Sequence, residues 1–225
     1  MIETSGAPFL IHSLPLHCKI KHIPLKRIFD ILFSGVFIII CAPILLLITL
    51  LISLTSPGKP IYSHERVGRG GKTFRCYKFR TMFTDADQLL QKILRENPDL
   101  KREWEANYKL KNDPRITRLG QFLRKTSMDE LPQFWNVLKG DLSIVGPRPV
   151  VQEEIAKYYQ IKAHKILSIR PGITGLWQIS GRSDICNYAK RVELDECYVD
   201  NQSFLLDLKL VLKTVPALIQ SRGAY

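Results

Sequence analysis

Two adjacent carboxylates, Asp129 and Glu130, are the residues whose types and spacing best suit chemistry. They lie within residues 127–133, and basic residues flank this stretch on both sides in the sequence: Arg115, Arg118, Arg124, Lys125, Lys139 and Arg148. Such a concentration of positive charge suits a phosphate, because cations neutralise the charge of phosphate oxygens. The carboxylate pair is therefore our candidate for the centre of a phosphate-handling site.

A helix is expected to begin beside the two carboxylates. Ser127 followed three residues later by Glu130 fits the S-x-x-E capping box. Pro132, which is best tolerated in a first turn, instead favours Asp129 as the N-cap. In both arrangements the carboxylates lie where the helix dipole and free N–H groups favour an ionised carboxylate and a bound phosphate. The plainer interpretation is a well-capped helix without a catalytic role, since caps far outnumber catalytic pairs.

The composition limits the class of protein and its partners. The chain has 225 residues, 45% of them hydrophobic, and a formal net charge of +12. This length accommodates one sizeable domain and one membrane element. The charge suits an acidic partner, namely a nucleic acid, an anionic membrane surface or a phosphorylated substrate. The five cysteines show no C-x-x-C spacing, so the sequence indicates neither a disulfide framework nor a zinc site and favours a reducing compartment.

An uncharged apolar run from residue 31 to residue 54 is long enough to cross a bilayer. Pro43 divides the run, and each half reaches only to about mid-bilayer. Both flanks are basic, and the positive-inside rule places basic flanks in the cytoplasm. A re-entrant helix–break–helix satisfies both flanks, and a proline-kinked span is the equal alternative. The flanking residues are Lys19, Lys21, Lys26 and Arg27 before the run, and Lys59, Arg66, Arg69, Lys72 and Arg75 after it.

Two strands joined by a glycine-rich turn are expected next, at residues 61–66 and 73–79. Gly71-Lys72-Thr73 looks like the end of a phosphate-binding P-loop. That motif requires a glycine where this chain has Arg66, and it requires a helix afterwards. An alternating, aromatic strand follows instead, so a β-hairpin is the preferred interpretation.

Charged helices are expected within residues 84–110, divided at Pro98, and a further helix from Asp113. The helix beside the carboxylates is expected to end at Gly140. In the last helix, residues 204–219, one face carries Leu205, Leu208, Leu212, Val215 and Ile219. Such a face packs on a core or lies in a membrane interface, and core packing is the commoner outcome.

Arg148 lies between two prolines, in a rigid turn after a short strand expected within residues 142–149. Little backbone freedom suits a guanidinium that is presented to a phosphate, although an ordinary exposed turn has the same sequence. A second glycine-rich, loop-like region covers residues 170–182 and contributes Arg182.

In their order and number, these stretches resemble the bacterial sugar transferase family, the monotopic phosphoglycosyl transferases that begin lipid-linked glycan assembly. The resemblance covers almost the whole chain from Lys26. It is carried by Lys26-Arg27-Ile28-Phe29-Asp30, the Pro43 break, Lys78-Phe79-Arg80-Thr81-Met82, Arg115-Ile116-Thr117-Arg118, residues 127–133, residues 136–141, Gly146-Pro147-Arg148-Pro149 and residues 170–175. Larger members carry additional spans and a regulatory domain, so the resemblance leads us to expect the minimal catalytic unit here, and residues 222–225 are similar to the hexose-1-phosphate branch.

Together with the patterns above, the resemblance implies an α+β, mostly helical fold. Residues 1–27 are expected to form a lead-in, residues 28–55 a re-entrant membrane helix, and residues 56–225 a cytoplasmic catalytic domain with a small β-hairpin. The protein is then expected to be monotopic in the bacterial inner membrane, with its catalytic domain on the cytoplasmic face and with membrane lipid as a partner.

The resemblance also implies an activity, which is transfer of a sugar 1-phosphate from a UDP-sugar to undecaprenyl phosphate with release of UMP. This is the first membrane step of exopolysaccharide, capsule or O-antigen synthesis. In the family, the aspartate of the pair is the nucleophile and the glutamate helps to hold Mg²⁺, which corresponds to Asp129 and Glu130. The candidates for neutralising the diphosphate are Arg80, Arg124, Arg148 and Arg182. Galactose or glucose is expected over N-acetylated sugars, no nucleic-acid partner is expected, and a homodimer is left open.

Two alternatives differ in class. The first is a one-step transferase that binds both substrates together, with Asp129 only a metal ligand. The second is a non-enzymatic, membrane-anchored basic protein that binds anionic lipid or nucleic acid. The second explains the net charge and the anchor but does not explain a charge pattern centred on one acidic pair.

Overall fold

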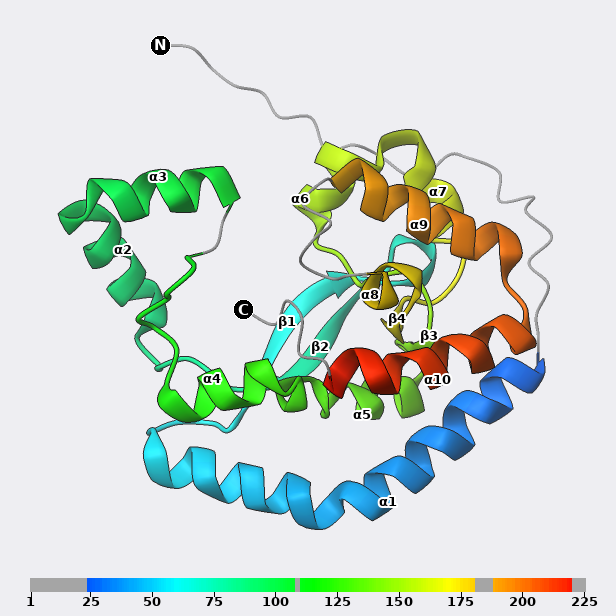
Figure 1. Ribbon diagram of the computed structural model, residues 1–225, viewed down its shortest axis with the longest axis horizontal. Coiled ribbons are helices and arrows are strands. Elements are labelled where there is room, and N and C mark those ends of the chain that lie inside the picture. Colours follow the sequence, from blue (N-terminus) through cyan, green and yellow to red (C-terminus); the bar gives the residue numbers. More distant parts are fainter. Residues whose placement is uncertain (1–23, 108–109, 181–187, 220–225) are drawn as a thin grey trace.

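The computed structural model describes residues 24–107, 110–180 and 188–219. In these ranges the chain is mostly helical, with two small two-stranded sheets and one long apolar helix near the N-terminus (Figure 1). The expected α+β, mostly helical class is confirmed at this level. Most of the expected lead-in lies outside the described residues.

Helix α1 (Pro24–Thr55) is the apolar helix, and it stays helical through Pro43. The expected break is therefore a bend, which Figure 1 shows near the middle of α1, with both ends turned toward the rest of the molecule. Proline accounts for a bend because it lacks the N–H donor and its ring clashes with the preceding turn. The helix begins at Pro24 rather than at Ile28, and a proline is well tolerated in a first turn.

The antiparallel hairpin of β1 (Ile61–Val67) and β2 (Thr73–Phe79) is confirmed, as are the charged helices α2 (Ala86–Glu96) and α3 (Pro98–Asn107). Figure 1 shows α2 and α3 projecting from one side of the molecule, away from the hairpin. Their position fits the charged, solvated faces that the sequence indicates.

Helix α4 (Arg118–Lys125) begins later than the expected start near Asp113. Asp113 is instead paired with Arg115 at 2.7 Å in a buried turn. The hydroxyl of Thr117 then accepts a hydrogen bond from the backbone N–H of Gly120 at 2.9 Å and caps the helix. A paired aspartate and a threonine cap thus move the helix start five residues along the chain.

The second sheet pairs β3 (Ser143–Val145) with β4 (Gly172–Thr174) in parallel. The expected loop at residues 170–182 is therefore wrong in part, since it contains β4 and the short helix α8 (Leu176–Ile179). A side chain at Gly172 would bring its Cβ to 2.1 Å from the backbone nitrogen of Gly146, so close backbone approach explains the glycine.

Five further α-helices lie in the described part of the chain, beside short 3₁₀ and π turns, and two of the five, α9 and α10, close it as expected. They are α5 (Gln133–Lys139), α6 (Gln152–Glu154), α7 (Ala163–Ile166), α9 (Tyr188–Asn201) and α10 (Phe204–Ile219). Of the two alternatives for the Leu205–Leu208–Leu212 face of α10, packing on the core, the commoner outcome, is wrong, because these side chains are exposed. The opposite face is buried through Asp207 and Leu210.

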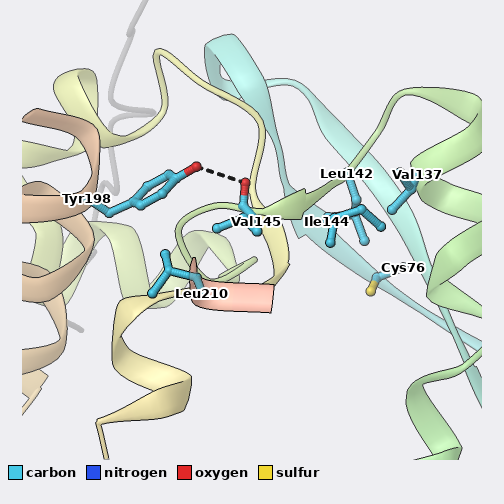
Figure 2. Packing of buried hydrophobic residues seen from close by; sticks show 7 residues of the cluster. All are labelled: Cys76, Val137, Leu142, Ile144, Val145, Tyr198 and Leu210. Atoms are coloured by element: carbon cyan, nitrogen blue, oxygen red, sulfur yellow. Dashed lines mark hydrogen bonds between the residues drawn. The ribbon is translucent and has the colours of Figure 1, made fainter. Parts of the chain in front are cut away.

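One buried apolar cluster joins the hairpin to the C-terminal helices (Figure 2). Its members are Cys76, Val137, Leu142, Ile144, Val145, Tyr198 and Leu210. The hydroxyl of Tyr198 in α9 donates to the carbonyl of Val145 in β3 at 3.2 Å, which satisfies a polar group inside the cluster. The cluster packs β2, α5 and β3 together into one body.

The first turns of α1 are fastened to this body by charged side chains. Lys26 Nζ donates to the carboxylate of Asp207 at 2.7 Å and to the carbonyl of Val145 at 2.9 Å. Arg27 donates to the carbonyls of Val137 and Leu138 at the end of α5. Asp30 is buried and accepts from the backbone N–H of Ile144 at 3.0 Å. The Lys26-Arg27-Ile28-Phe29-Asp30 piece is therefore a structural junction between α1 and the domain.

We expect Asp207→Asn to lower the free energy of unfolding by about 3 kcal/mol, because it leaves the Lys26 ammonium without its carboxylate at a buried site. Thermal unfolding in detergent measures the effect. The matched control is Asp200→Asn, which breaks the exposed ion pair with Lys165 and should leave the melting temperature nearly unchanged. Equal melting temperatures for the two variants would contradict the structural role of this junction.

The far end of α1 is fastened to the same body. Ile48 and Ile52 are buried against Phe79 of β2 and Leu123 of α4. Just beyond the helix, the carbonyl of Ser56 accepts a hydrogen bond from the Arg80 guanidinium at 2.7 Å. Both ends of the apolar helix therefore contact one domain, while its apolar side chains between these contacts are largely exposed.

Candidate active site

The carboxylate pair lies between α4 and α5, in a single 3₁₀ turn, Met128–Glu130. Both predicted helix starts are wrong, because Pro132 is the N-cap of α5 and the side chain of Ser127 makes no capping hydrogen bond. Ser127 instead adopts a left-handed conformation (φ 57°), and its backbone N–H donates to the carbonyl of Arg124 at the end of α4. The predicted end of α5 at Gly140 is confirmed (φ 92°).

Asp129 is buried, with 9% of its surface exposed. Burial has the largest effect on the pKa of its carboxyl and raises it, Lys78 and Arg124 lower it, the charge of Glu130 raises it, and the resulting pKa is about 6. The expectation of a carboxylate held firmly ionised by a helix dipole is corrected here, since desolvation outweighs the cations. At neutral pH the group is still mainly a carboxylate, and a poorly solvated carboxylate is a stronger nucleophile than a hydrated one.

Glu130 is the more exposed member of the pair and forms an ion pair with Lys78 of β2 at 2.6 Å. About a third of each side chain is exposed. Lys78 belongs to a stretch that the sequence singled out, but its role beside the pair was not predicted. The sequence did contain a signal for the face on which Lys78 lies. Side chains alternate along a strand, so Lys78 shares one face of the hairpin with Cys76.

Arg124 of α4 lies beside Asp129 and is held there by neighbouring groups. Its Nε donates to the hydroxyl of Thr81 at 2.9 Å. Burial lowers the pKa of the guanidinium, and the charge of Asp129 opposes this shift. Helix α4 can approach Thr81 because position 120 is glycine, where an added Cβ would lie 2.0 Å from the Thr81 carbonyl oxygen. The structure thus brings together Asp129, Glu130 and Arg124 of the predicted residues.

Asn136 sets the position of α5 against the hairpin. It is fully buried, its side-chain oxygen accepts from the backbone N–H of Tyr77 at 3.0 Å, and its amide donates to the carbonyl of Arg75 at 2.7 Å. The Asn136 side chain, which belongs to a helix, thus bonds the backbone of β2 as a neighbouring strand would. Because Arg75 and Tyr77 lie directly before Lys78 on β2, these bonds hold in place the strand that supplies the cation to Glu130.

Arg148 lies in a turn after β3, as predicted, and the turn is held rigidly. Its backbone N–H donates to the carboxylate of Asp195 at 3.4 Å, and Tyr159 donates its hydroxyl to the same carboxylate at 3.0 Å. Burial raises the pKa of Asp195 to about 7, which these hydrogen bonds oppose. The guanidinium of Arg148 lies 5.0 Å from the ring centre of Trp177, so it stacks on a buried aromatic side chain.

Cys76 links the two basic regions of the site. Burial raises the pKa of its thiol to about 11. The thiol also lies near enough to four charged side chains for their charges to act on that pKa: Lys78, Glu130, Arg66 and Arg148. A buried thiol with such a pKa is not a nucleophile. Arg66 is a second residue whose role sequence reasoning missed, because the sequence placed it only in a strand and among the basic flanking residues.

Of the four predicted phosphate-binding arginines, the described structure brings only Arg124 to the pair. Arg80 donates to the carbonyl of Ser56, so its described contact is with the end of α1. Arg182 lies outside the described residues. A role for either in binding a diphosphate stays a prediction.

The residues present fit a Mg²⁺ ion only if the substrate supplies some of its ligands. The described part of the chain contains no group of three or more His, Cys, Asp or Glu side chains arranged to hold a metal ion. It offers two adjacent carboxylates, of which Glu130 is partly exposed beside Lys78. This donor set suits Mg²⁺, which prefers one or two carboxylates completed by substrate phosphates and water.

A buried carboxylate, a second carboxylate and two nearby cations, Lys78 and Arg124, together suit transfer of a phosphoryl group. Comparison with known proteins agrees. A family model described as bacterial sugar transferase matches residues 21–221. The exopolysaccharide production protein ExoY of Rhizobium meliloti is 48% identical over 200 residues, which cover 89% of this chain and 88% of that protein.

Two longer proteins are also similar. The undecaprenyl-phosphate galactose phosphotransferase of Salmonella typhimurium is 48% identical over 202 residues, which cover 89% of this chain and 42% of that protein. The UDP-glucose:undecaprenyl-phosphate glucose-1-phosphate transferase of Klebsiella pneumoniae is 38% identical over 206 residues, covering 89% of this chain and 41% of that protein. The resemblance seen in the sequence is thereby confirmed.

Proposed function

The chain belongs to the bacterial sugar transferase family, and on that premise we propose that it transfers a sugar 1-phosphate from a UDP-sugar to undecaprenyl phosphate. The observation that carries this proposal is the buried Asp129 beside Glu130, Lys78 and Arg124. The names of the relatives support the lipid carrier, the sugar 1-phosphate and a role in exopolysaccharide synthesis. Galactose or glucose is the expected sugar.

The proposed reaction has two steps. A carboxylate oxygen of Asp129 attacks the phosphorus that bears the sugar, the bond from that phosphorus to the bridging oxygen breaks, and UMP leaves with the bridging oxygen and its electron pair. An oxygen of undecaprenyl phosphate then attacks the same phosphorus, and the bond to Asp129 breaks. The carboxylate is regenerated and an undecaprenyl-diphosphate sugar is formed, so neither step requires an external oxidant or acid.

The side chains around Asp129 have separate tasks in this scheme. Lys78 and Arg124 neutralise phosphate oxygens, which lets an anionic nucleophile approach an anionic substrate. Glu130 would hold Mg²⁺, which supplies charge neutralisation at the diphosphate when bound. Because Glu130 is paired with Lys78, the ammonium must turn from the carboxylate toward the incoming phosphate when the site fills.

A screen of UDP-sugars for UMP release tests the proposed function. Purified protein with undecaprenyl phosphate and Mg²⁺ is expected to release UMP from UDP-galactose or UDP-glucose and to form a lipid-linked sugar. Absence of UMP release from every UDP-sugar would contradict the proposal and favour the non-enzymatic, membrane-anchored alternative.

We also propose that α1 is re-entrant, so that the protein is monotopic with its domain on the cytoplasmic face of the inner membrane. Two observations support this arrangement. Lys26 and Asp30 at one end of α1, and Ile48 and Ile52 at the other, contact the same domain. A straight span would carry one of these ends across the bilayer, away from its contacts. Exposed apolar residues on the neighbouring helices suit a membrane surface: Phe122 of α4, Trp135 of α5, and Leu205, Leu208 and Leu212 of α10.

Both flanks of α1 are therefore expected to be protected from a membrane-impermeant thiol reagent in intact cells. Single cysteines at positions 20 and 59, in a background without other accessible cysteines, provide the measurement, and both should react only after the cells are lysed. Labelling of one position from outside would identify a straight span.

A further inference from the structure

A second basic group lies further along the same face of the hairpin. Arg66 of β1 and Arg148 lie close enough that the charge of Arg148, after burial, lowers the pKa of the Arg66 guanidinium. The described carboxylate nearest to Arg66 is Glu154, at 3.9 Å, and it also accepts a hydrogen bond from Tyr188. Like charges in a partly buried site repel, so the arrangement favours an anion that contacts both guanidinium groups.

Two buried donors in this group have no partner among the described residues. They are Nε of Arg148 and Nε1 of Trp177, which is 6% exposed. Arg148 and Arg191 lie 5.0 Å and 5.1 Å from the ring centre of Trp177. Buried donors are normally paired, and each unpaired one calls for an explanation such as a ligand. An anion with several oxygens could accept a hydrogen bond from each of these two donors.

The group is preorganised rather than a set of loose surface side chains. Asp195, which is 1% exposed, fixes the backbone of Arg148, and Tyr159 fixes Asp195. The antiparallel register fixes Arg66 opposite Phe74. Positions held in this way lose little conformational entropy when a ligand binds.

The spacing of this group from the carboxylate pair indicates a different part of the same substrate. Arg66 lies opposite Phe74, and Phe74 is four residues from Lys78 on β2, which corresponds to about 13 Å along the strand. Cys76 lies between them on that face, within reach of both sets of charges. One phosphate cannot contact both ends of this span, but an extended nucleotide sugar can.

We propose that Arg66, Arg148 and Trp177 form the subsite for the nucleoside monophosphate half of the donor, and for UMP after it leaves. The inference rests on the proposed function. With the sugar-bearing phosphorus at Asp129, the other phosphate and the nucleoside extend along the hairpin toward Arg66. Arg66 and Arg148 then neutralise the charge that UMP gains when the bridging bond breaks.

The test is Arg66→Gln, with Arg75→Gln as the matched control, because Arg75 lies on the opposite face of the same hairpin and is exposed. Calorimetry measures UMP binding, and kinetics measure KM for the UDP-sugar and for undecaprenyl phosphate. We expect Arg66→Gln to weaken UMP binding and to raise KM for the UDP-sugar by about tenfold or more, as for loss of one charge-assisted contact to phosphate. The KM for undecaprenyl phosphate should not change, and Arg75→Gln should behave as wild type.

Two outcomes would overturn the subsite. One is unchanged UMP affinity in Arg66→Gln, and the other is an equal rise in KM for undecaprenyl phosphate, which would assign the group to the lipid phosphate. Arg66→Lys retains the charge and should recover part of the UMP affinity if Arg66→Gln is poorly folded; no recovery in a folded Lys variant also counts against the subsite. Failure of the proposed function is distinguishable, because the wild-type protein would then release no UMP at all.

Discussion

Asp129→Asn is expected to reduce turnover by about 1,000-fold or more, because it removes the nucleophile while keeping nearly the same shape. The measurement is UMP release with saturating UDP-sugar and undecaprenyl phosphate. Retention of more than about a tenth of wild-type turnover would exclude Asp129 as the attacking group. A variant that also fails to bind UMP would indicate misfolding rather than lost chemistry, so UMP binding is the control.

The same variant is expected to be at least as stable as wild type. Burial raises the pKa of Asp129 to about 6 from an ordinary 3.8, so the folded state holds this proton more tightly than the unfolded state. The ionised group therefore costs up to about 3 kcal/mol of stability at pH 7, a cost that appears as pH rises from 3.8 through 6 and is absent below that range. A neutral asparagine removes the cost, and Asp129→Asn should melt no lower than wild type at pH 7.5.

Activity should rise with pH over the range in which ionisation of Asp129 lowers stability. The nucleophile must be ionised, so the rate of the first step in wild type should fall as pH decreases below about 6. A rate that is independent of pH between 5 and 8 would contradict an essential Asp129 with a raised pKa.

Glu130→Gln is expected to reduce turnover by about 100-fold, because it weakens the carboxylate site that would hold Mg²⁺ at the diphosphate. Removing Mg²⁺ from wild type with a chelator should have a similar effect, and added Mg²⁺ should restore wild type but restore the variant poorly.

The control for Glu130→Gln is a variant that breaks the same ion pair from its other side. Lys78→Gln breaks the same pair but leaves the carboxylate, so it should lower activity without lowering the dependence on Mg²⁺. Equal Mg²⁺ dependence of wild type and Glu130→Gln would assign Glu130 to positioning Lys78 and leave the metal with other ligands.

Elements with a local signal could be predicted from the sequence. The hairpin follows from the alternation on either side of Gly68-Arg69-Gly70-Gly71, and the last helix from its apolar spacing and length. The end of α5 follows from Gly140, which adopts the left-handed conformation that glycine favours.

Elements that depend on distant partners could not be predicted. Strand β4 has a strand conformation because β3 pairs with it in parallel, and nothing near residues 172–174 indicates that partner. The leucine face of α10 suited either a core or a membrane interface, and its sequence alone could not decide between them. The face that is buried carries Asp207, which is paired with Lys26 of α1, a residue far away in sequence.

The candidate site was predicted in part, for similar reasons. Asp129, Glu130 and Arg124 are close in sequence, so their charge pattern could be recognised. Lys78 and Arg66 reach the site only through the pairing and register of the hairpin. The capping rule failed at Ser127 because this residue ends α4 in a left-handed conformation, which no local motif indicates. Arg80 resembles a phosphate ligand in sequence but contacts the end of α1.

The most direct test of the central claim uses wild-type protein, a UDP-sugar labelled in the sugar, and no undecaprenyl phosphate. The two-step route predicts UMP in an amount up to that of the protein, with the labelled sugar phosphate attached to Asp129 after a rapid quench and peptide mapping. Added undecaprenyl phosphate should then discharge the label to lipid. If no label attaches, and UMP forms only when the lipid is present, Asp129 is not a covalent nucleophile and the one-step route is correct.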